Sequence, residues 1–320
     1  MATGSDLEVT ADLRCRQQAI AMGLDPVGTA QTLAGLVLVE RPLPWPRDVS
    51  EDPVLAPAVE AGLSGEHGPI RPFAVVPRGA GVGPATTPEG AVLVTSYRLV
   101  GSTPGPYEQR TYCVDEHRVA DLTLTLAGGG EPDETPLDGG GSDRELLVCT
   151  HGSRDRCCGR FGTLLHRSAA SRRPEVEVRR VSHTGGHRFA PTALLLPCGT
   201  AWGHLDDDVL DAIVNRSVPF VEVIGHFRGS MVVPSRAAQV AEAAVAARVG
   251  WSLFDAPRQV AVLAEPEPGR AGQFEVHVAG RSWLVAVEHN GFTRQPVCMS
   301  ELDQATKTDP RFAVSTVERL

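Results

Sequence analysis

The sequence has few aromatic residues, no long apolar run and no excess of positive charge. Aromatic residues make up 5% of the 320 residues, and no apolar run approaches the roughly 20 residues that a membrane-spanning helix needs. The formal net charge is −9, so the whole molecule lacks the basic footprint of a nucleic-acid-binding protein. The first residues contain neither a positive nor an apolar segment, and no secretory signal is expected. We therefore expect neither membrane nor nucleic acid as a partner.

The seven cysteines do not form a disulfide framework. Their number is odd, their spacing is irregular, and no Cys-x-x-Cys pair of the thioredoxin type is present. We therefore expect the reducing cytoplasm as the compartment.

Three other common functional patterns are also missing. No convincing carboxylate pair for glycoside cleavage is visible. The glycine-rich segment at 79–83 is followed by prolines rather than by a helix, so it is interpreted as a turn and not as a phosphate site. No flavin or nicotinamide fingerprint occurs, so another protein would have to supply electrons for redox chemistry.

The length of 320 residues suits two domains better than one. Residues 127–142 contain six glycines and few apolar side chains, which is too little to order a segment of chain on its own. This linker separates an N-terminal α/β domain, residues 1–126, from a second domain at 143–252. A β-rich C-terminal extension follows at 253–320. The fold class is therefore α/β, and no internal repeat is visible.

Periodicity and turn residues predict the elements of each part. In the N-terminal part we expect a helix over 15–23, short helical pieces over 52–63, and strands over 33–39, 72–76, 91–99 and 108–114. In the second part we expect strands over 145–149, 175–181 and 219–224, a hairpin over 191–205, and helices over 161–170, 206–216 and 236–248. The last part is expected to form strands over 259–263, 274–278 and 283–288, with a mobile polar tail after Met299.

Sulfur and imidazole donors gather in two short loops of the second domain. Residues 149–159 read CTHGSRDRCCG directly after a predicted strand, and residues 183–187 read HTGGH after another. Two glycines inside a helix would cost about 2 kcal/mol against alanine, so the second loop is expected to be irregular. Thiolates select zinc, copper(I) or iron–sulfur clusters, and imidazole suits zinc and iron. The donor set Cys149, Cys158, His183 and His187 therefore predicts a metal centre.

The residues alone leave alternatives open. Buried cysteines and surface histidines in a glycine-rich protein would give the same pattern without any metal. Structural zinc sites usually have cysteines two to four residues apart, unlike these, but a zinc-stabilised interaction module on the same four residues stays open. A thiol–disulfide oxidoreductase using Cys149, Cys157 and Cys158 is a third interpretation.

The chain resembles the sucrase/ferredoxin-like family, whose core is a thioredoxin-like ferredoxin domain. The resemblance lies in the short segments LVCTHGSRD and CG around Cys149 and Cys158 and in SHTGGHRFAP around the histidines. It also includes RGS at 228–230, RAAQVAE at 236–242, Cys15, GTA at 28–30, Trp45 and PVC at 296–298. The likeness thus spans most of the sequence.

The resemblance implies a thioredoxin-like ferredoxin domain at 143–252. It also implies a [2Fe–2S] cluster held by Cys149, Cys158, His183 and His187. It is the resemblance, not spacing, that assigns Cys158 rather than Cys157. Imidazole ligands raise the potential of such a cluster and can couple electron transfer to protons. We therefore expect an electron carrier with a redox partner protein, rather than a stand-alone enzyme.

Several neighbouring residues are expected to support this centre. By analogy with thioredoxins, Pro191 is expected to be cis and next to the site. Arginines in both loops could steer an acidic electron donor. The supporting set consists of His151, Gly152, Arg154, Cys157, Gly185, Gly186, Arg188 and Pro191. The remaining cysteines, Cys15, Cys113, Cys198 and Cys298, are expected to be small buried side chains. A second metal site from Cys15 and Cys298 is the disfavoured alternative.

Overall fold

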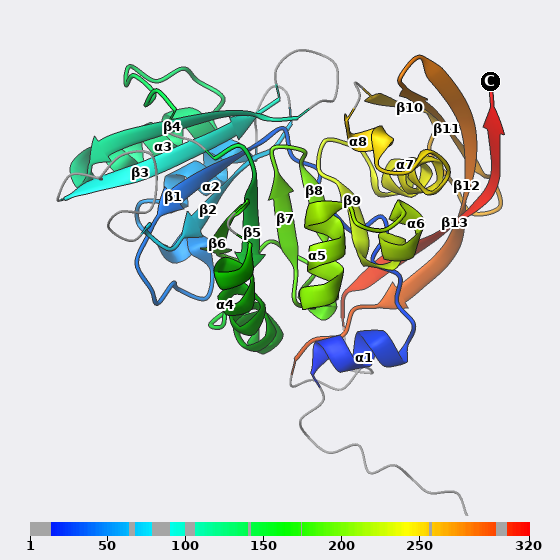
Figure 1. The fold of residues 1–320 in the computed structure, drawn as a ribbon, viewed down its shortest axis with the longest axis horizontal. Coiled ribbons are helices and arrows are strands. Elements are labelled where there is room, and N and C mark those ends of the chain that lie inside the picture. The colour runs from blue at the N-terminus through cyan, green and yellow to red at the C-terminus, as the bar shows by residue number, and fades with distance from the viewer. Residues whose placement is uncertain are drawn as a thin grey trace, which may run out of the picture.

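A computed structural model describes residues 14–63, 68–78, 90–99, 106–139, 142–173, 175–255, 258–298 and 306–320. Their fold is mixed α/β, with one large mixed sheet and a separate antiparallel sheet at the C-terminal end of the chain (Figure 1). The large sheet has nine strands in the order β4-β3-β1-β2-β6-β5-β7-β8-β9. No helix in the described part of the chain is long and apolar enough to cross a membrane. The turn expected at 79–83 lies outside the described residues.

The first half of the large sheet is built from the N-terminal part of the chain. Its strands β1 and β2 are parallel, β3 is antiparallel to β1, and β4 is antiparallel to β3. Helices α2 and α3 pack on one face of this half through a core that includes Leu55, Leu122 and Leu126. The elements are α1 (Cys15–Ala21), β1 (Gly35–Glu40), α2 (Ala56–Gly62), β2 (Ile70–Val75), β3 (Ala91–Arg98), β4 (Glu108–Asp115) and α3 (Val119–Ala127).

The second half repeats the same strand arrangement. Strands β5 and β6 are parallel around α4, β7 is antiparallel to β5, and β8 is antiparallel to β7. The order β4-β3-β1-β2 of the first half therefore corresponds to β8-β7-β5-β6, which is the second half read in the opposite direction along the sheet. The elements are β5 (Glu145–Cys149), α4 (Thr163–Arg172), β6 (Glu177–Val181), β7 (Ala193–Leu196), β8 (Thr200–Trp202), α5 (Asp207–Asn215), α6 (Phe220–Val223), β9 (Phe227–Ser230) and α7 (Arg236–Val249).

The C-terminal sheet curves around α7, which lies between the two sheets (Figure 1). Ser235 accepts a hydrogen bond from the backbone N–H of Ala238 and so begins α7. The alanine-rich surface of α7 lets both sheets approach it closely, and Phe274 and Val285 of the small sheet join the main hydrophobic core. After the short helix α8 (Ser252–Asp255), the strands are β10 (Arg258–Ala264), β11 (Gly272–Val278), β12 (Arg281–Arg294) and β13 (Thr308–Arg319).

Two expectations about local structure were wrong, and one helix was not expected at all. The segment expected as a strand at 219–224 forms helix α6, because Pro219 adopts the N-cap conformation and Phe220 packs into an aromatic cluster with Trp202. The tail after Met299 was expected to be mobile. Its described part instead contains strand β13, which pairs with β12 along most of its length. Helix α3 was not expected, although it ends at the start of the predicted linker.

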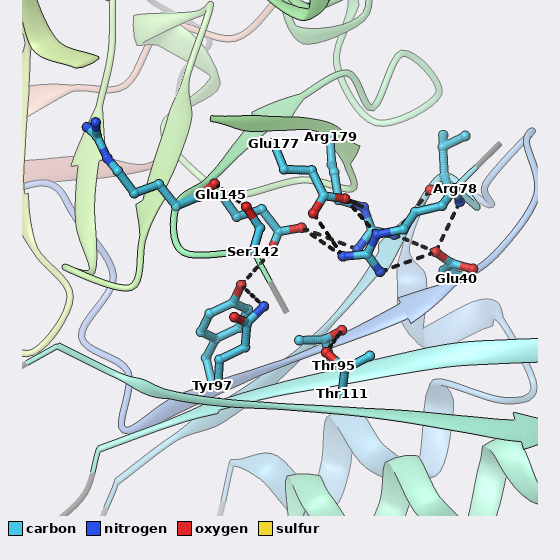
Figure 2. Close-up of polar contacts among 12 residues, drawn as sticks. Glu40, Arg78, Thr95, Tyr97, Thr111, Ser142, Glu145, Glu177 and Arg179 are labelled. Carbon is cyan, nitrogen blue, oxygen red and sulfur yellow. Dashed lines mark hydrogen bonds and ion pairs between the residues drawn. The ribbon is translucent and has the colours of Figure 1, made fainter. Parts of the chain in front are cut away.

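Two half-sheets meet at a single ladder pair, Val75 of β2 with Val181 of β6. A buried ion-pair network reinforces this junction (Figure 2). Arg179 lies 2.8 Å from Glu40 and 3.3 Å from Glu145, and Arg78 lies 2.6 Å from Glu177. Because Glu40 and Arg78 come from the first half and the other residues from the second, the network ties the halves together. The domain bounds proposed above stay a prediction.

We expect Arg179→Leu to destabilise the protein by about 3 kcal/mol, because it leaves buried carboxylates with one cation fewer. The free energy of unfolding in urea is the measurement. Arg110→Leu is the matched control, since Arg110 pairs with Glu108 and Glu131 at the surface and should change stability by no more than about 1 kcal/mol. Equal stability of Arg179→Leu and the unaltered protein would contradict this account of the junction.

Candidate metal centre

The loop after β5 is kept compact by two close backbone contacts, one to the last residue of its own strand and one within the loop. A Cβ atom on Gly162 would lie 1.9 Å from the carbonyl oxygen of Cys149. A Cβ atom on Gly159 would lie 2.5 Å from the Cα atom of Gly152. No other residue type fits these positions without moving backbone. Gly159 and Gly162 both lie in the turn Cys158–Gly162, which is π-helical. Such local widening of a helix is frequent at functional sites.

This tight loop brings the two predicted sulfur donors together with one histidine. Ligand atoms of Cys149, Cys158 and His183 all lie within 4.8 Å of one another. The Sγ atom of Cys149 is 3.9 Å from Nδ1 of His183. Both cysteines are fully buried, whereas His183 is half-buried. The structure thus places three of the four predicted donors around one point.

The neighbouring thiols of Cys149 and Cys158 shift each other's pKa in opposite directions. The Cys158 thiol, followed by His183, holds the pKa of Cys149 well below its usual value despite burial. The Cys149 sulfur and burial in turn raise the pKa of Cys158 well above its usual value. Thiolate is the form that binds metals, and these pKa directions favour it at Cys149 over Cys158.

Three polar side chains fix the loop that carries the histidines. The ring of His151 is buried; its Nδ1 accepts a hydrogen bond from the backbone N–H of His183, and its Nε2 lies 2.8 Å from the carbonyl oxygen of Pro46. Burial lowers the pKa of His151, which keeps the ring neutral as this hydrogen bond requires. Arg71 donates to the carbonyl of His183, and Arg228 donates to the carbonyl of Gly185.

His187 lies beside His183 and also touches a second group of donors. The two histidine rings are tilted, with centroids 5.9 Å apart. The Nδ1 atom of His187 is 3.3 Å from both Asp155 Oδ2 and Cys15 Sγ. Burial, and then the neighbouring His183, lower the pKa of His187 to about 4. A neutral ring is the form that ligates a metal.

Cys157 points away from the first group. Its Sγ atom lies 3.3 Å from that of Cys298, and Cys298 lies 3.3 Å from Cys15. Together with Asp155, these three cysteines form a second set of ligand atoms within 4.8 Å of one another. The geometry therefore separates neighbouring Cys157 and Cys158 into different groups. Sequence reasoning considered Cys15 and Cys298 only as a disfavoured second metal site, and it did not connect Asp155 or Cys157 with them.

A comparison with known protein families bears on this site. The model of the sucrase/ferredoxin-like family matches residues 26–229, more than half of the chain. The chain belongs to the sucrase/ferredoxin-like family. No curated protein and no solved structure matches it. The matched region contains both loops of the first group, whereas Cys15 and Cys298 lie outside it.

The other residues predicted to support the centre of this sucrase/ferredoxin-like chain lie around it with different partners. Gly185 and Gly186 have φ values of +77° and +68°; a Cβ on Gly186 would meet the Arg228 guanidinium at 2.5 Å. The peptide bond before Pro191 is cis, as expected, and the backbone N–H of Cys149 donates to the carbonyl of Thr192 next to it.

Two of the arginines expected to steer a partner, Arg154 and Arg188, already have ion pairs. Arg154 is partly exposed and lies 2.9 Å from Asp48. Arg188 is buried and pairs with Asp309 of β13. Sequence reasoning did not single out Arg71, and it noted Arg228 only within the RGS segment of the family resemblance. The role of both arginines in holding the histidine loop comes from tertiary contacts that no local pattern shows.

We expect Gly162→Ala to lower the free energy of unfolding by about 3 kcal/mol, because the added methyl group would overlap the backbone at Cys149. Gly225→Ala is the control: a Cβ there meets nothing within 4 Å, so it should change stability by less than about 0.5 kcal/mol. Urea unfolding of both variants checks the difference. Similar stabilities for both would mean that the loop is not held by this contact.

Proposed function

We propose that the chain is an electron-transfer protein that holds a [2Fe–2S] cluster through Cys149, Cys158, His183 and His187. The observation that carries the proposal is the convergence of two buried sulfurs and the His183 ring on one point, with the His187 ring beside them. Family membership supports it through the ferredoxin-like part of the family description.

The residues present fit such a group. Two soft sulfur donors are fully buried, and two imidazoles are only half-buried. One thiolate is already favoured at Cys149. A cluster of this type, when bound, supplies transfer of single electrons, and two histidine ligands place its potential above that of all-cysteine plant-type clusters.

The unequal burial of the donors indicates where a partner would dock. Cys149 and Cys158 are 0% exposed, so the chain excludes water from the sulfur side of the centre. The side chain of His187 is 20% exposed, and His183 is also half-buried. We infer that a redox partner protein approaches the histidine side, where the path to the centre is shortest. The reducing cytoplasm is the compartment proposed for this exchange.

Two alternatives use overlapping residues. A zinc ion on the same four donors would make the site a structural interaction module. Thiol–disulfide exchange would use Cys149, Cys157 and Cys158, but Cys157 contacts Cys298 and lies in the other donor group. The arrangement therefore favours a metal centre over thiol exchange at Cys149.

The proposal predicts a red-brown protein after anaerobic purification, with iron and acid-labile sulfide at about two each per chain by the stoichiometry of the cluster. Metal analysis and visible absorption are the measurements. Cys149→Ser should lose the iron and the colour, whereas Cys113→Ser, outside both donor groups, should keep them. A colourless protein with zinc lost only in Cys149→Ser would point to the zinc module instead.

Replacing either histidine ligand by cysteine should keep the cluster and lower its reduction potential by on the order of 100 mV, because a thiolate adds negative charge. Potentiometric titration of His183→Cys and His187→Cys measures the shift, with His117→Cys at an exposed position as the control. Unchanged potentials in the first two variants would exclude the histidines as ligands. The pH dependence of the potential in these preparations tests the expected proton coupling.

A further inference from the structure

Three cysteines and one carboxylate from distant parts of the chain converge outside the proposed cluster ligands. Cys15 begins helix α1, Asp155 and Cys157 lie in the loop after β5, and Cys298 follows strand β12. Cys15 and Cys298 are 283 positions apart in the sequence. In Figure 1, α1 lies at the lower edge of the molecule near the strands of the C-terminal part.

The spacing of these atoms resembles a tetrahedral zinc site. The Sγ atom of Cys298 lies 3.3 Å from the sulfurs of both Cys157 and Cys15, and Cys15 lies 3.8 Å from Asp155 Oδ2. Zinc bonds of 2.3 Å to sulfur and about 2.0 Å to oxygen would place sulfurs about 3.8 Å apart and sulfur and oxygen about 3.5 Å apart. The three distances given above differ from this geometry by no more than about 0.5 Å, and the other three pairs of ligand atoms lie within 4.8 Å.

The surroundings favour a cation over a packed apolar cluster. Cys15 and Cys157 are fully buried and Asp155 is 7% exposed. Burying a carboxylate costs free energy unless hydrogen bonds or a cation satisfy both of its oxygen atoms. Two backbone N–H groups, of Cys157 and Cys158, donate to its Oδ1 atom. These bonds leave Oδ2 directed toward Cys15 and His187.

A disulfide explains the group less well. All seven cysteines are free, and a bond between Cys157 and Cys298 would leave Cys15 and Asp155 without a role. Cys298 lies at the same distance from both other sulfurs. This is expected when three sulfurs surround one metal ion, whereas a disulfide would bring one pair closer than the other. Zinc accepts a carboxylate beside thiolates, whereas copper(I) selects sulfur alone.

We propose that Cys15, Cys157, Cys298 and Asp155 bind one structural zinc ion. The four ligands come from the protein, so the site is closed to substrate, as structural zinc sites are. Zinc would fasten α1 and the segment after β12 to the loop that carries Cys158. This inference does not rest on the proposed cluster, because the two sites share no ligand.

The test is metal analysis of the full-length protein, purified anaerobically from zinc-supplemented medium. We expect one zinc per chain in addition to any iron. Cys298→Ser and Cys15→Ser should lose the zinc and keep the iron, whereas Cys149→Ser should lose the iron and keep the zinc. Cys198→Ser, outside both donor groups, is the control and should keep both metals.

X-ray absorption at the zinc edge of the unaltered protein supplies a second measurement that needs no variant. It should show about three sulfur ligands and one oxygen ligand. Absence of zinc, zinc retained in both Cys15→Ser and Cys298→Ser, or a Cys157–Cys298 disulfide in fresh protein would overturn the inference. A protein without iron whose zinc is lost in Cys298→Ser would refute the proposed cluster and leave the zinc site supported. Iron lost in Cys298→Ser but kept in Cys149→Ser would refute both.

Discussion

The close contact of Gly162 with the carbonyl of Cys149 is the constraint on which both donor groups depend. It folds the loop back on the end of β5, so Cys158 returns to Cys149 after eight intervening residues. At the start of the π-helical turn that Gly162 ends, the neighbouring side chains of Cys157 and Cys158 point in different directions. Cys158 therefore reaches the first group and Cys157 the second. One backbone approach thus positions sulfur atoms for both donor groups.

The repeated half-sheet arrangement gives the site its place in the fold. Glu40 ends β1 as Cys149 ends β5, and both residues flank the joining pair Val75–Val181 in one row across the sheet. In the first half this position carries a carboxylate that pairs with Arg179. In the second half it carries a sulfur. The same topology therefore serves an ion-pair network in one half and a candidate metal centre in the other.

Local patterns predicted most of the strands and helices, because apolar alternation and capping residues such as Ser235 act within a few positions. The motif loops were also visible, since Cys149 and His183 directly follow strands. Helix α6 and strand β13 were missed because packing against Trp202 and pairing with β12 decide them. The second donor group could not be found from spacing, since no local pattern links Cys15 to Cys298.

His187 connects the two groups physically. Its ring lies beside His183, while its Nδ1 atom faces both Asp155 and Cys15 at 3.3 Å. A histidine ligand commonly donates its other ring N–H to a carboxylate, which fixes the ring and raises its basicity. Asp155 is placed to accept that proton and to ligate in the second group. With metals bound as proposed, a change of charge at either centre would act on the other through this one imidazole. The second group would then tune the first as well as fasten the chain.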